Sequence, residues 1–166
     1  MANKTSFTPE EWQQVLQGVM MSSMAVSAAD PSGLWGMLKE GFANAGALAD
    51  IKSKGTSNEL IKAIVDDFGT SEGRSATRDG LKEKFAGAKA PDIRALSVES
   101  LSELSALLDT KAPEDAPEVK AWLRDIAQRV AEASKEGGFL FFGGERVSEA
   151  ERATLDEIST ALNIRA

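Results

Sequence analysis

Apolar residues recur at helical spacing along most of this chain, and the pattern predicts an all-helical protein. The first segment shows it most clearly, because Thr8 is a good N-cap, Pro9 suits the first helical position and Glu11 completes a capping box. Pro31 cannot continue a helix, so we expect the first helix to end just before it. Its apolar residues recur at intervals of three and four: Trp12, Val15, Leu16, Val19, Met20 and Met24.

The middle of the chain predicts three more helices. The apolar stripe over 34–51 indicates the second, and Ser57 and Gly69 are typical of the start and the end of the third. The segment 70–80 is polar and contains glycine, so we expect a loop there. A short helix is expected over 81–88.

The last part of the chain predicts three further helices. Pro91 opens the fifth, and the Pro-containing segment 111–117 separates it from the sixth, which starts at Asp115 or Ala116. Ser148 begins a second capping box, which opens the seventh helix.

These elements predict the fold class all-α, as a single compact bundle of about seven helices with mostly antiparallel neighbours. We expect residues 1–166 to form one helical domain, with 1–7 as a disordered N-terminal tail. The first and second helices should pair as an antiparallel hairpin, and so should the sixth and seventh. The expected core is Trp12, Val19, Leu38, Phe42, Ile64, Phe68, Leu104, Trp122, Ile126, Leu155 and Ile158.

Composition narrows the chemistry that this bundle can perform. The formal net charge is −7 and the basic residues are scattered, which disfavours nucleic acid because phosphate binding depends on lysine and arginine. The chain has no cysteine and no histidine, so disulfides and thiol nucleophiles are excluded and zinc or copper sites are not expected. We expect no cofactor. No stretch has the length and apolarity of a membrane span, so we expect a cytoplasmic protein.

A glycine-bracketed aromatic run over 137–144 is the most unusual local feature. Its apolar side chains are Phe139, Leu140, Phe141 and Phe142. They could dock into a partner protein or a second copy of the chain. Alternatively, the rings could pack beneath the helices while the glycines supply turns with positive φ.

Two groups of charged residues could bind ions. Asp30, Asp66 and Asp67 could help to hold Ca²⁺ or Mg²⁺, which prefer hard oxygen ligands, or they could be solvated carboxylates at helix ends. Arg74 and Arg78 lie four residues apart near the expected start of the short helix. They could hold an anion or could simply be exposed charges on a loop.

Four methionines form a further candidate ligand site. They could line an adaptable apolar groove for a lipid or a helix, or they could fill the core. They are Met20, Met21, Met24 and Met37.

The C-terminal segment resembles two groups of proteins. The run 137–144, followed by Val147, Ser148 and Glu151, looks like the closing signature of uncharacterised bacterial helical proteins, a family that implies no activity. More distantly, 144–162 resembles the second half of tellurite-resistance TerB-like helical domains, and 28–33 is similar to their helix exit. The TerB-like resemblance implies a helical fold. No Asp precedes Gly144, so this chain departs from the acidic metal site of that family.

The sequence leaves three functional hypotheses. The leading one is a non-enzymatic module that binds another cytoplasmic protein or a second copy of itself. The second is a small-molecule or divalent-metal binder, and the third is an enzyme that uses carboxylates. No nucleophile with an adjacent base is recognisable along the chain.

Overall fold

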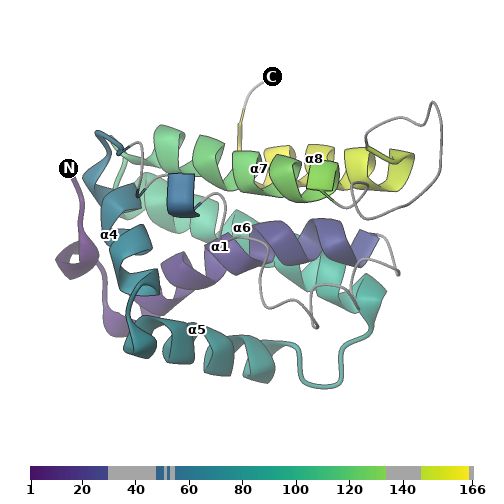
Figure 1. Ribbon diagram of the computed structural model, residues 1–166, viewed down its shortest axis with the longest axis horizontal. Coiled ribbons are helices and arrows are strands. Elements are labelled where there is room, and N and C mark those ends of the chain that lie inside the picture. The colour runs from purple at the N-terminus through teal and green to yellow at the C-terminus, as the bar shows by residue number, and fades with distance from the viewer. Residues whose placement is uncertain (30–47, 51, 53–54, 134–146, 165–166) are drawn as a thin grey trace.

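A computed structural model describes residues 1–29, 48–50, 52, 55–133 and 147–164, and this part of the chain is an all-α bundle without strands. In Figure 1, α7 and α8 lie along one side and α5 along the other, with α1 and α6 between them. The helices of the described residues are η1 (Lys4–Ser6, a 3-10 helix), α1 (Pro9–Ala29), α4 (Glu59–Phe68), α5 (Ser71–Lys84), α6 (Ala90–Lys111), α7 (Ala116–Ala133) and α8 (Glu149–Ala161).

Helix α1 is the central element and contacts α4, α5, α6, α7 and α8. Helix α1 carries buried residues on nearly every side, because other helices pack around it. Small residues are needed at the points where those helices come closest. Gly18 is the clearest case, because a Cβ atom there would overlap the side chain of Leu104 on α6. Glu11 near the start of α1 pairs with Lys111 at the end of α6 at 3.2 Å, so these two helices run antiparallel.

Both predicted capping boxes are confirmed. The Thr8 amide donates to Glu11 Oε2 at 2.8 Å, and the Glu11 amide donates to Thr8 Oγ1 at 3.2 Å. Ser148 and Glu151 form the same reciprocal pair at the start of α8, at 2.8 and 3.2 Å. Each pair satisfies amides that the helix itself leaves without acceptors.

The third predicted helix is confirmed as α4, but its cap is Asn58 rather than Ser57. The Asn58 side chain accepts a hydrogen bond from the Ile61 amide at 3.0 Å. Its amide nitrogen also donates to Glu118 Oε2 at 3.0 Å. The cap therefore also ties α4 to α7, a long-range contact that the local pattern does not reveal.

The expectation of a loop over 70–80 was wrong, because this segment forms most of α5. Thr70 caps the helix by accepting from the Gly73 amide at 2.9 Å. Gly73, Thr77 and Leu81 are the buried positions, and the Thr77 hydroxyl donates to the Gly73 carbonyl at 2.8 Å. Two of these three buried positions are glycine and threonine, so no apolar stripe marks the inner face of α5 over 70–80. The short helix expected over 81–88 is the end of α5, which stops at Lys84.

The first seven residues also differ from the disordered tail that the sequence suggests. Asn3 caps η1, and Ala2 and Phe7 are buried. The Ala2 amide donates to Asp115 Oδ2 at 2.6 Å, and the Phe7 ring packs 5.8 Å from the ring of Trp12. Tertiary contacts therefore hold a segment whose own sequence has little helical pattern.

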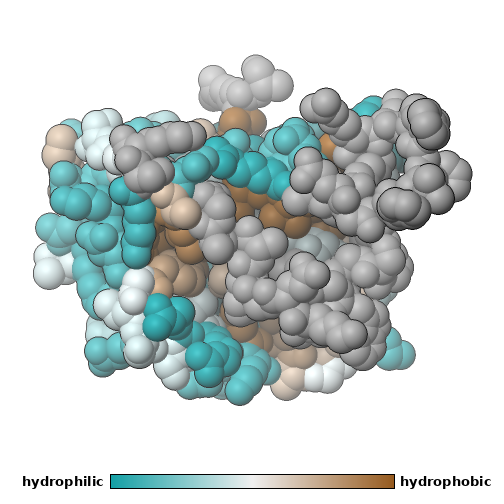
Figure 2. Space-filling model, in the orientation of Figure 1, coloured by the Kyte–Doolittle hydropathy of each residue, from teal (hydrophilic) through white to brown (hydrophobic). Residues whose placement is uncertain are grey.

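The core agrees with the prediction wherever the structure describes it, except that Phe68 is only partly buried. Leu38 and Phe42 lie outside the described residues, as does most of the second predicted helix, so the first predicted hairpin stays a prediction. In Figure 2, hydrophilic residues gather along the left and lower edges of this face, and apolar residues show in its middle. Among the described helices, none is long and apolar enough to cross a membrane. The remaining predicted core residues are buried: Trp12, Val19, Ile64, Leu104, Trp122, Ile126, Leu155 and Ile158.

Candidate functional site

Helix α8 lies between two surface hollows, which together form the candidate site. On one side it packs against α7 and on the other against α6. A hydrogen bond of 2.8 Å from Arg124 Nε on α7 to Ser159 Oγ on α8 joins the first pair. The predicted hairpin of the sixth and seventh helices corresponds to α7 and α8. We call the hollow between α7 and α8 the α7–α8 pocket, and the hollow between α6 and α8 the α6–α8 groove.

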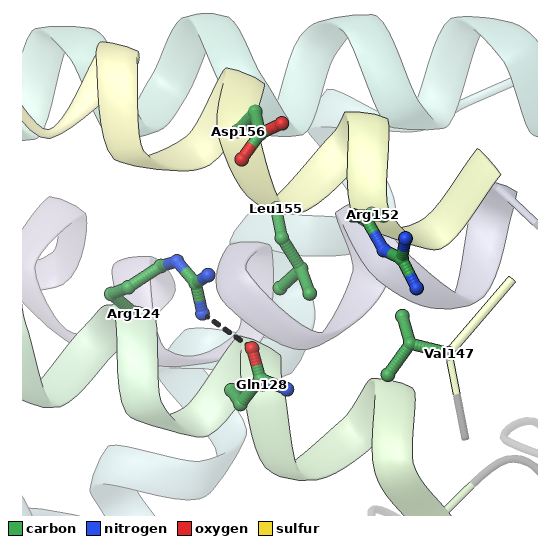
Figure 3. A pocket seen from close by; sticks show the side chains of 6 residues that line it. All are labelled: Arg124, Gln128, Val147, Arg152, Leu155 and Asp156. Carbon is green, nitrogen blue, oxygen red and sulfur yellow. Dashed lines mark hydrogen bonds between the residues drawn. The ribbon is translucent and has the colours of Figure 1, made fainter. Parts of the chain in front are cut away.

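The α7–α8 pocket is small, with a volume of about 280 Å³. Figure 3 shows the Arg124 side chain of α7 extending toward Gln128 and Leu155, and the Arg152 side chain of α8 extending toward Val147. Leu155 is buried and Val147 is half-buried, so the pocket has apolar walls beneath its charges. Its described lining residues are Arg124, Gln128, Val147, Arg152, Leu155 and Asp156.

Two hydrogen bonds hold the guanidinium of Arg124 in place. Nε donates to Ser159 Oγ at 2.8 Å, and Nη1 donates to Gln128 Oε1 at 3.0 Å. Gln128 is itself oriented by its bond to Glu132 Oε1 at 2.8 Å. The guanidinium of arginine has more N–H donors than these two bonds use, so Arg124 can still donate toward the pocket.

The α6–α8 groove is wider and has a volume of about 620 Å³. Val98 and Ser102 line it on the α6 side, and Ala153 and Ala161 on the α8 side. These side chains are short, so they leave room for another backbone to approach closely. Residues 153 to 161 span about 12 Å of α8, which is roughly two helical turns.

The charged side chains among the described lining residues of the α6–α8 groove are all acidic. Glu99, Asp156 and Glu157 are all exposed, and no basic residue is among its described lining residues. Arg94 lies nearby and pairs with Glu157 at 3.5 Å. The groove therefore presents a negative rim around a floor of small side chains. Asp156 lines both the groove and the α7–α8 pocket.

A third hollow, of about 540 Å³, lies between the start of α1 and the α4–α5 corner. Asp67 lines it and is held by two other residues of this hollow. Trp12 Nε1 donates to Asp67 Oδ2 at 2.7 Å, and Lys4 Nζ contacts both carboxylate oxygens at 3.0 Å. The carboxylate expected as a metal ligand thus has an ammonium and an indole as its partners.

The other predicted metal ligands do not join Asp67. Asp66 is exposed in the last turn of α4, and Asp30 lies outside the described residues. Among the residues that the structure describes, no group of three acidic side chains is close enough together to hold a metal ion.

The structure does not bring Arg74 and Arg78 together as an anion site on a loop, because both lie on helix α5. Arg74 Nη1 donates to the carbonyls of Phe68 and Gly69 at 3.0 and 2.9 Å, so it caps the end of α4. Cations are favourable at helix C-termini for this reason. Arg78 is exposed on α5.

Two other predicted sites are only partly described. Phe139, Leu140, Phe141 and Phe142 lie outside the described residues, so their role as an interaction surface stays a prediction. Met20 and Met21 are buried in the core, Met24 is half-buried, and Met37 is not described. The three described methionines of this group therefore pack in or against the core rather than line an open groove.

Sequence reasoning missed Arg124, Arg152 and the rim of the α6–α8 groove. Arg124 and Arg152 lie on separate helices, so no local motif contains both. The pairing of the sixth and seventh helices was predicted, but their register was not. The register is what brings these two arginines to one pocket, so it is the signal that could have found them.

No family model, no curated protein and no solved structure matches this chain. The resemblances to helical bacterial proteins and to TerB-like domains therefore stay predictions.

Proposed function

We propose that this protein is a non-enzymatic interaction module whose α6–α8 groove binds a basic amphipathic helix of another protein. The acidic rim around a floor of small side chains is the observation that carries the proposal. Amphipathic helices commonly dock with one apolar face in a groove. Short residues at the floor allow the close helix approach that ridge-into-groove packing requires.

Charge selects the kind of partner. Glu99, Asp156 and Glu157 line the groove, and the chain carries a net charge of −7. Lysine or arginine residues flanking the apolar face of a partner helix would meet these carboxylates, whereas a second copy of this chain would bring further negative charge. Complementary charge raises association rates and disfavours partners of like charge.

The expected complex is weak to moderate in affinity. A groove of about two helical turns is at the small end of specific interfaces, and exposed ion pairs contribute about 0.2–1 kcal/mol each. Such an interface suits reversible regulation or recruitment. The chain has no cysteine, which is compatible with a reducing compartment, and a cytoplasmic location is part of the proposal.

An amide-resolved NMR titration tests this function. The probe is an amphipathic helical peptide of leucine, alanine and lysine, and the control is the same peptide with glutamate in place of lysine. We expect saturable shifts from the lysine peptide at Ser102, Ala153 and Ala161, weakening as salt is added. The glutamate peptide should produce none.

Two results would contradict the proposal. The first is that the lysine peptide causes no saturable shift of the groove amides, or that it shifts amides on α5 as much as those of the groove. The other is a protein that dimerises in sedimentation experiments and whose groove amides shift with protein concentration in NMR spectra. That result would replace a basic partner with a second copy of this chain.

A further inference from the structure

We propose that Arg94 is an internal competitor for the basic partner helix. It pairs with the carboxylate of Glu157 in the free protein and gives way when the partner binds. The inference rests on the function proposed for the α6–α8 groove, and it adds a residue that controls affinity there. An ion pair between the two walls of the groove carries it.

The first step concerns the position of Arg94 on α6. Arg94, Val98 and Ser102 follow one another at intervals of four residues, and residues four apart are neighbours on one side of a helix. Val98 and Ser102 line the groove. Arg94 therefore extends their row by one helical turn, about 5.4 Å, toward the start of α6.

The second step concerns Glu157 on α8. Ala153, Glu157 and Ala161 form the corresponding row of α8, and all three line the groove. Arg94 Nη2 lies 3.5 Å from Glu157 Oε1, and Arg94 Nη1 donates to Thr154 Oγ1 at 3.4 Å. Arg94 thus reaches from one wall of the groove to the other and pairs with the carboxylate in the middle of the α8 row.

The third step concerns the strength of this pair. The side chains of Arg94 and Glu157 are 38% and 44% exposed, and their distance is longer than the 2.7 Å between Lys120 and Asp109. Charged hydrogen bonds are usually about 2.7–2.9 Å long. An exposed and long ion pair contributes little to stability, so a basic residue of the partner can replace Arg94 at small cost.

The fourth step concerns the charge of the groove. Glu157 is one of its three carboxylates, beside Glu99 and Asp156. The guanidinium of Arg94 offsets the charge of one of them in the free protein. Removing this guanidinium leaves Glu157 available and makes the rim more negative, and both effects favour a basic helix.

A double-mutant cycle tests the inference, with the lysine peptide as the probe in calorimetric titrations. Arg94→Gln should bind the peptide about two- to fivefold more tightly than wild type. In the Glu157→Gln background the same change should alter affinity by less than about 1.5-fold, because the carboxylate for which Arg94 competes is gone. Arg78→Gln is the matched control, since it removes one exposed positive charge on α5 and should leave affinity unchanged.

Two further measurements separate competition from an effect on folding. Circular dichroism and thermal unfolding show whether each variant keeps the fold. In the wild type, the NMR signal of the Arg94 side-chain Nε–H group should shift together with the groove amides as the lysine peptide is added, because Arg94 leaves Glu157. This measurement needs no variant.

Three outcomes would overturn the inference while the function of the groove stands. They are an Arg94→Gln variant that binds no more tightly than wild type, a gain of equal size with and without Glu157, and an Arg94 side-chain signal that stays fixed while the groove amides shift. If the wild type and every variant fail to bind the lysine peptide, the proposed function is wrong and this inference falls with it.

Discussion

Trp12 Nε1 donates a hydrogen bond of 2.7 Å to Asp67 Oδ2, which joins the central helix α1 to the last turn of α4. Lys4 from the N-terminal segment completes the arrangement at 3.0 Å from the same carboxylate. The carboxylate of Asp67 therefore connects α4 to η1 and α1, two segments that lie 63 and 55 residues earlier in the sequence at Lys4 and Trp12. Its role in the described structure is that of a tertiary clamp.

The clamp predicts a specific loss of stability. Asp67→Asn should lower the free energy of unfolding by about 1.5–3 kcal/mol, since hydrogen bonds to charged groups contribute about that much. Asp66→Asn is the matched control, because Asp66 is exposed on the same turn and should change stability by less than about 0.5 kcal/mol. Urea unfolding followed by tryptophan fluorescence measures both, and equal effects of the two variants would contradict the clamp.

Gly18 provides a second prediction, on packing. Leu104 occupies the space that a Cβ atom would need, so Gly18→Ala should destabilise the fold by about 1–3 kcal/mol despite alanine's higher helix propensity. Gly80→Ala is the control, because there a Cβ atom would meet only the flexible ends of Gln13 and Gln17. Thermal unfolding should therefore show a lower Tm for Gly18→Ala and a neutral or raised Tm for Gly80→Ala. A neutral Gly18→Ala variant would contradict the close approach of α1 and α6.

Glu11 predicts how stability depends on pH. Its bond from the Thr8 amide, and secondarily its contact with Lys111, hold the pKa of this carboxyl below its ordinary value. A lowered folded-state pKa means that the stabilisation is present at neutral pH. This stabilisation begins to be lost as the pH falls below about 4.3, the pKa of glutamate in the unfolded chain. It is gone once the pH has fallen through the lower pKa of Glu11 in the folded protein.

The measurement compares wild type with Glu11→Gln across pH. The wild type should be more stable at pH 7, and the difference should shrink at acidic pH. Glu83→Gln, on the exposed face of α5, controls for the loss of one negative charge. The stability difference between wild type and Glu11→Gln could instead stay constant from neutral pH to well below the ordinary pKa of glutamate. That result would show that the ionised form of Glu11 does not stabilise the fold.

Local interactions explain why much of the fold could be predicted from the sequence. The capping boxes at Thr8 and Ser148 use residues three positions apart, so the pattern contains all that is needed. The helical assignment of 70–80 could not be found in that way. Burial of Gly73 and Thr77 against neighbouring helices, rather than an apolar stripe, defines the inner face of α5.

The candidate site was less predictable for a related reason. Arg74 and Arg78 are close together in the sequence and looked like an anion site, but Arg74 is used to cap α4. Arg124 and Arg152 line one pocket only because α7 and α8 pack together. The acidic groove likewise depends on the register between α6 and α8, which no single segment encodes.

Asp156 predicts how charge affects binding in the groove. This carboxylate lines the α6–α8 groove, so Asp156→Asn should weaken binding of the lysine peptide by about two- to fivefold. A calorimetric titration measures the affinity. An unchanged affinity, with the fold intact, would argue against the charge assignment of the groove.

Filling the α6–α8 groove tests the central claim most directly. Ala153 and Ala150 are both exposed on α8, but only Ala153 lines the groove. The dissociation constant of the lysine peptide should rise at least tenfold in Ala153→Trp and stay within about twofold of wild type in Ala150→Trp. Equal affinities in the two variants, with the fold intact by circular dichroism, would show that this groove does not bind the partner helix.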